Sequence, residues 1–67
     1  MNAAEISRSY NNIGLDFKNL NQLDSSTYYF NKALEYLNKG GFSNHKLTNA
    51  IYSNYLLNLT MTGKLNQ

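Results

Sequence analysis

Cysteine is absent from this 67-residue chain, and its absence removes two kinds of stabilisation. Without thiols the chain can form neither a disulfide nor a thiolate metal site, and nothing in it indicates an oxidising compartment. His45 is the only histidine, so no set of zinc ligands can be assembled around it. We therefore expect a cytoplasmic protein with no metal and no other cofactor.

Long apolar runs and clustered charge are also missing. No run approaches the roughly 20 apolar residues of a membrane-spanning helix, and residues 1–9 lack the apolar centre of a signal peptide. Only 15% of the residues are charged, with a formal net charge of +2. The six basic residues are scattered, whereas phosphate-backbone binding requires them to be gathered on one face. We expect neither membrane insertion nor direct nucleic-acid binding.

Signatures of catalysis are equally scarce. A Ser-His-Asp triad would need His45 beside Asp16 or Asp24 in a pocket that so small a helical chain can hardly enclose. The four acidic residues are too few and too scattered to nominate a carboxylate pair. Gly40-Gly41 lacks the Lys-Ser/Thr that completes a phosphate-binding loop, and reads as a helix stop. The sequence predicts a protein that is not an enzyme.

Apolar residues are present at helical spacing in three segments. The first predicts a helix over about 3–20. The second predicts a helix over about 24–38, with Asp24 as its N-cap, and the third a helix over about 44–62, with Ser43 as its N-cap and Gly63 at its end. The aromatic residues on these stripes, and Tyr52 beside the third, are expected to be core. The three stripes are Ile6, Tyr10, Ile13, Phe17 and Leu20; Phe30, Ala33, Leu34 and Leu37; and Leu47, Ile51, Tyr55, Leu59 and Thr62.

Two small residues predict how the first two helices meet. A glycine inside a helix costs about 1 kcal/mol relative to alanine, so Gly14 is best explained by a close helix crossing. Ala33 on the second helix follows the same logic. An offset of 42 residues then carries Tyr10 to Tyr52 and Phe17 to Leu59, which indicates an internal repeat, although Gly14 falls on Leu56.

The segment 10–37 resembles one tetratricopeptide (TPR) repeat, through Tyr10, Ile13, Gly14 and Phe17 on the first helix and Leu23, Phe30, Ala33 and Leu34 on the second. The 42-residue offset exceeds the usual period of about 34. With Asn11-Asn12 before the glycine, it is similar to the longer repeats of kinesin light chains and bacterial peptide-sensing regulators. Ser26, where alanine is usual, departs from the pattern. The resemblance implies an all-α fold: one domain, 1–67, with an antiparallel helical hairpin plus a third helix, about one and a half repeats of an α-solenoid.

The resemblance also implies a function, because the first helix of each TPR unit lines a groove for an extended peptide. Asn12 and Asn54 correspond in the two units, and in related repeats an asparagine here grips the peptide main chain. Leu57 and Met61 would supply an apolar floor. The implied peptide-binding residues are Arg8, Asn11, Asn12, Leu15 and Asn19 on the first helix and Ser53, Asn54, Leu57 and Met61 on the third.

Other interpretations stay open. Asn12 and Asn54 can be ordinary solvated residues in a chain with 12 asparagines, and Arg8 can pair with Glu5 or Asp16 instead of a ligand. The preferred function is a non-catalytic scaffold that binds a protein or peptide. The alternatives are a peptide-sensing fragment of a bacterial transcription or signalling regulator, and a structural oligomerisation segment. The face of the third helix expected to remain uncovered suggests a longer array or self-association.

Overall fold

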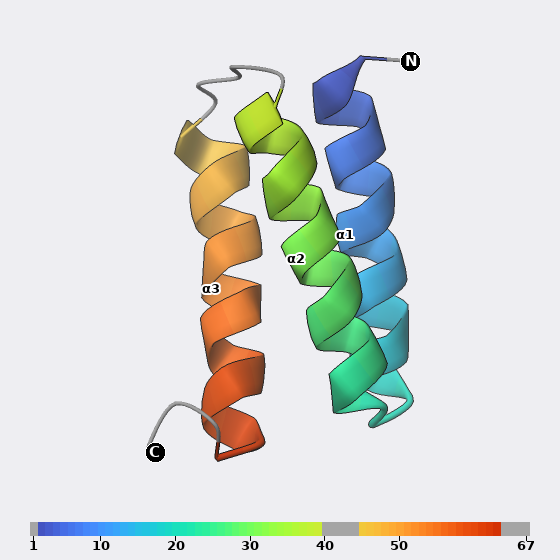
Figure 1. The fold of residues 1–67 in the computed structure, drawn as a ribbon. Helices are drawn as coiled ribbons and strands as arrows, with labels where there is room; N and C mark the ends of the chain where they lie inside the picture. The colour runs from blue at the N-terminus through green and yellow to red at the C-terminus, as the bar shows by residue number, and fades with distance from the viewer. Residues whose placement is uncertain (1, 40–44, 64–67) are drawn as a thin grey trace.

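Three α-helices make up the structure, a computed structural model that describes residues 2–39 and 45–63. They are α1 (Ala3–Asn19), α2 (Leu23–Lys39) and α3 (His45–Met61), and no strand occurs in these two ranges. Successive helices run in opposite directions, so α1 and α3 point the same way and α2 packs against both (Figure 1). The predicted all-α class, with a helical hairpin and a third helix, is confirmed.

The helix ends follow from local hydrogen bonding. The Asn2 side chain accepts a 2.9 Å hydrogen bond from the Glu5 N–H and caps α1. After α1, Asn21 adopts a left-handed φ of 61°, which asparagine tolerates better than most residues. The chain then enters α2 at Leu23, so Asp24 lies inside the first turn and its prediction as the N-cap is wrong.

The other predicted ends have mixed outcomes. Gly63 follows the end of α3 as predicted. Its φ of 78° is left-handed, a conformation that strains residues with a Cβ and therefore favours glycine at the end of a helix. Gly40, Gly41 and Ser43, predicted as a helix stop and an N-cap, lie outside the described residues.

Small residues form the line along which α1 meets α2. Ala4, Ser7 and Gly14 are the buried residues of α1. A Cβ at Gly14 would lie 2.6 Å from the ring of Phe30, which is fully buried. The glycine is therefore required by the approach of that ring, and the predicted close crossing is confirmed.

The large residues of the stripe predicted for α1 lie beside this line instead of on it. Ile13 is 37% exposed and Leu20 66%, so the apolar stripe predicted for α1 is not buried along its whole length. Tyr52 is 50% exposed, so its prediction as core is wrong. The Phe30 ring fills the space opposite Gly14, and the large side chains of α1 lie at the flanks of the interface. On α1 the flank is filled by stacked rings: Tyr10 lies between Tyr29 (centroids 6.0 Å apart) and Tyr36 (5.5 Å) of α2.

The apolar core centres on α2. Phe30, Ala33 and Leu37 of α2 join Ile51 of α3 in one buried cluster. Ile51 and Asn58 are the buried residues among those of α3 whose burial is described, so α3 is fastened to the hairpin by a narrow contact. No helix within the described ranges is long and apolar enough to cross a membrane.

Candidate functional site

Three polar side chains are fully buried between the helices: Ser7, Ser26 and Asn58. The Ser7 hydroxyl donates to the Ala33 carbonyl (2.9 Å), and the Ser26 hydroxyl donates back to the Gly14 carbonyl (2.6 Å). The two bonds cross the α1–α2 interface in opposite directions, seven residues apart on each helix. They favour one antiparallel register of the hairpin, because sliding one helix along the other would break both.

Asn58 extends this hydrogen bonding to the third helix. Its Nδ2 donates to the Ser26 hydroxyl oxygen at 2.8 Å, so α3, α2 and α1 are joined through Ser26. The Asn58 Oδ1 is buried and has no hydrogen-bond partner within residues 2–39 and 45–63. An unpaired buried acceptor costs about 1–3 kcal/mol, so this contact positions α3 but also weakens its attachment.

Sequence reasoning missed these polar residues. Ser26 stood out only as a departure from the TPR pattern, and Asn58 only as one more asparagine. One signal was present: Ala4, Ser7, Asn11 and Gly14 are small or polar residues at spacings of 3, 4 and 3, a second helical line beside the apolar stripe.

The predicted peptide-binding residues lie on α1 and α3, which run in the same direction. The Asn54 Nδ2 donates a 3.3 Å hydrogen bond to the Asn11 Oδ1, so one amide pair links the two helices. Asn54 is thus held by Asn11, a contact that the sequence did not suggest. We call the surface formed by the predicted residues of both helices the α1–α3 surface.

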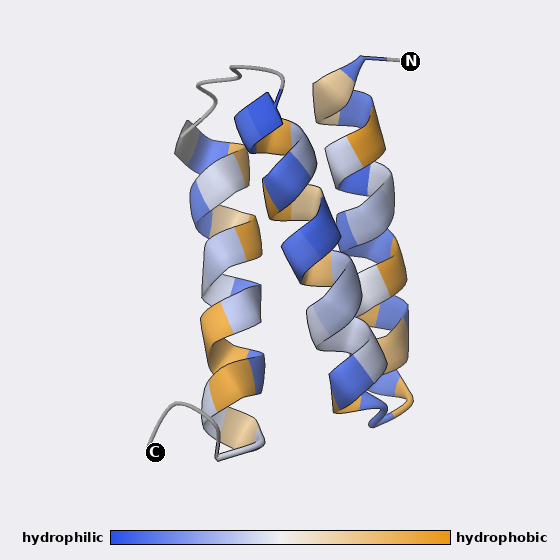
Figure 2. Cartoon of the chain, viewed as in Figure 1, coloured by the Kyte–Doolittle hydropathy of each residue, from blue (hydrophilic) through white to orange (hydrophobic). Residues whose placement is uncertain are grey.

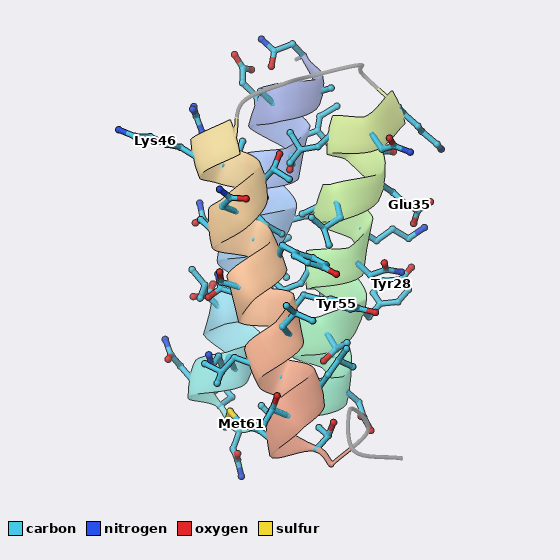
Figure 3. The ribbon with its side chains drawn as sticks, turned by 90° about the vertical axis from the view of Figure 1, so that its left-hand side faces the viewer. Tyr28, Glu35, Lys46, Tyr55 and Met61 are labelled. Atoms are coloured by element: carbon cyan, nitrogen blue, oxygen red, sulfur yellow. The ribbon has the colours of Figure 1, made fainter. Side chains whose placement is uncertain are left out.

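The structure divides the predicted residues into two groups by exposure. Asn11, Leu15 and Asn54 are half-buried, and Leu15 packs against the core cluster. Met61 points toward the α1 side of α3, whereas Tyr55 points toward α2 (Figure 3). The exposed group comprises Arg8, Asn12, Asn19, Ser53, Leu57 and Met61.

The charge on this surface comes from Arg8. It forms no salt bridge with Glu5 or Asp16, whereas the Lys32 Nζ lies 3.5 Å from the Glu35 Oε2. The Glu35 carboxylate is the main cause of a raised pKa at Lys32. Arg8 is therefore available to an anionic or carbonyl group of a ligand.

The α1–α3 surface carries both polar and apolar side chains. It offers amide, hydroxyl and guanidinium groups together with Leu57 and Met61, which are 48% and 53% exposed. No pocket and no group of three potential metal ligands occurs among the described residues. No protein-family model, curated protein or solved structure matches this chain, so the likeness of 10–37 to a TPR repeat is a resemblance only.

Proposed function

We propose that this chain is a non-catalytic interaction module that binds an extended peptide along the α1–α3 surface. The Asn11–Asn54 hydrogen bond supports this proposal most directly, because it holds two amides from different helices side by side. Polar groups of this kind can both donate to and accept from a peptide main chain.

The pair uses one donor and one acceptor. The bond uses the Asn54 Nδ2 and the Asn11 Oδ1, so the Asn11 Nδ2 and the Asn54 Oδ1 are left without a hydrogen bond among the described residues. A peptide strand lying along the surface can accept from the first and donate to the second. Asn12, exposed on α1, adds a third amide, and Leu57 and Met61 on α3 can receive apolar side chains.

Arg8 adds a preference of charge. It lies one helical turn before Asn12, so a peptide held by Asn12 would bring its neighbouring residue or carboxyl terminus within reach of the guanidinium. We therefore expect peptides with an acidic group near the α1 N-terminal end of the surface to bind best.

The test is a screen of a random ten-residue peptide library, followed by NMR titration of the tightest binder. Asn12→Ala should lower its affinity by about tenfold, the effect of losing one hydrogen bond of about 1.4 kcal/mol. Asn31→Ala, at an exposed asparagine of α2, is the matched control and should leave affinity unchanged. Binding that survives both Asn12→Ala and Asn54→Ala in folded protein would contradict the proposal.

A further inference from the structure

Helix α3 carries a second line of mostly apolar residues besides the one that packs on α2. Asn49, Tyr52, Leu56 and Leu59 follow each other at spacings of 3, 4 and 3, and we call them the outer seam. Asn49 is exposed, Tyr52 is 50% exposed, and Leu56 and Leu59 are half-buried. Figure 2 shows hydrophobic colouring over much of the lower half of α3.

Charge distinguishes this helix from the other two. Between Leu47 and Gly63 the sequence has no Asp, Glu, Lys or Arg. The charged residues of α1 are Glu5, Arg8, Asp16 and Lys18, and those of α2 are Asp24, Lys32, Glu35 and Lys39, whereas α3 carries Lys46 in its first turn and no further Asp, Glu, Lys or Arg. Solvent-facing sides of helices normally carry such residues, so the outer side of α3 has the composition of a covered surface.

We propose that the outer seam is the interface between two copies of this chain, paired α3 to α3 about a two-fold axis. A two-fold axis brings the same patch of both copies together, so any charge near the axis meets its like. The outer seam avoids that repulsion. Helix α3 thus offers another copy a long uncharged side.

The spacing of the seam also suits a helix pair. Alternating steps of three and four residues keep one stripe facing a partner helix over several turns. Asn49 is the polar member, and one polar position in such a stripe favours a single register at some expense of stability. The outer seam lies apart from Leu57 and Met61, so dimer formation and peptide binding use different residues of α3.

The size of the interface sets the expected affinity. A helix of 17 residues is about 25 Å long, and one helix pair buries less than the roughly 800 Å² per partner of a standard interface. We therefore expect a weak, reversible dimer, whose fraction rises as the protein concentration increases from about 10 µM to 1 mM.

Sedimentation equilibrium over that range tests the proposal. The wild-type mass should rise from 7.7 kDa toward twice that value. Tyr52→Glu and Tyr52→Lys should each weaken association by at least about tenfold, because each places like charges across the axis. An equimolar mixture of the two variants should associate again, because opposite charges then meet.

Tyr28→Glu is the matched control, since Tyr28 is a tyrosine of similar exposure, 56%, on α2. It should associate as the wild type does, and circular dichroism should show all variants equally helical. A wild type that stays monomeric at 1 mM would overturn the proposal, and this is also the result expected if the seam takes another protein's helix. Unchanged association of Tyr52→Glu, or a mixture that stays monomeric, would overturn it as well.

Discussion

Gly14 shows how much of this structure depends on an atom that is not there. The Phe30 ring occupies the place where any other residue would carry its Cβ, and the ring itself is fully buried. The Gly14 carbonyl also accepts the hydrogen bond of Ser26. One residue thus serves both the packing and the hydrogen bonding of the α1–α2 interface.

Gly14→Ala should therefore destabilise the fold even though alanine is the better helix former. The new methyl group would lie 2.6 Å from the Phe30 ring. Overpacking of this kind costs about 1–3 kcal/mol, and the upper part of that range exceeds the gain of about 1 kcal/mol in helix propensity. Urea denaturation followed by circular dichroism measures the change. In a Phe30→Leu background the cost of Gly14→Ala should shrink; an equal cost in both backgrounds would show that the ring is not responsible.

The sequence predicted the residues around this contact unevenly. Gly14 and Ala33 could be assigned to a close crossing because a small residue on the packing face of a helix lets a neighbouring helix approach. The flanking residues Ile13 and Leu20 could not be placed correctly, because hydropathy ranks them as core while the centre is taken by Ser7 and Gly14. Whether a serine is buried depends on the partner carbonyl, here that of Ala33, which no single-helix pattern reveals.

At the scale of elements, α3 differs from the hairpin in how it is held. The hairpin has two serine-to-carbonyl bonds and stacked rings, including Phe17 and Tyr29 with centroids 5.5 Å apart. In α3, Ile51 and Asn58 are buried, and Leu47 and Tyr55 pack partly buried against the core. The Asn58 Oδ1 has no hydrogen-bond partner among the described residues. We expect α3 to open more often than the other helices.

Hydrogen exchange measured by NMR should show this difference. Amides around Ile51–Asn58 should exchange faster than those around Phe30–Leu37, because local opening of α3 leaves the hairpin intact. Asn58→Leu removes the unpaired oxygen and should slow exchange in α3, because the cost of burying that oxygen disappears while the Ser26 hydroxyl keeps its hydrogen bond to the Gly14 carbonyl. Uniform exchange across the helices would contradict this view of α3.

The pair Asn11 and Asn54 shows why the α1–α3 surface was only partly predictable. Their residue types and helical positions followed from the sequence, and so did their placement on the two helices that run in parallel. The hydrogen bond between them did not, because it depends on how closely α3 approaches α1, and that distance is set by side chains of α2 such as Phe30 and Ser26.

The whole molecule has a small interior. Five apolar residues are buried in the described part of the chain, Ala4, Phe30, Ala33, Leu37 and Ile51, and two of these are alanines. A chain of this length buries only about 60% of the surface that its unfolded form exposes, which leaves little margin of stability. Any association that covers the outer seam would therefore supply a large fraction of the total free energy of unfolding.

Thermal unfolding should consequently depend on protein concentration. Binding of a second copy to the folded state alone raises the midpoint as concentration rises. We expect a midpoint that increases by several degrees between about 10 µM and 1 mM for the wild type, since about 1 kcal/mol shifts the midpoint of so small a domain by roughly 4–8 °C. The midpoint of Tyr52→Glu should stay constant, and a concentration-dependent midpoint in this variant would place the association elsewhere.

The contact between Gly14 and Phe30 also gives this protein a built-in spectroscopic label. A hydrogen of the Gly14 Cα points at the aromatic ring from the position of the missing Cβ, within reach of the magnetic field of the ring's circulating electrons. We expect its resonance to be displaced from the range of ordinary glycines while the ring is seated there, and to return to that range when the contact is lost. A single proton signal would thus report whether α1 and α2 are packed together at Gly14 and Phe30.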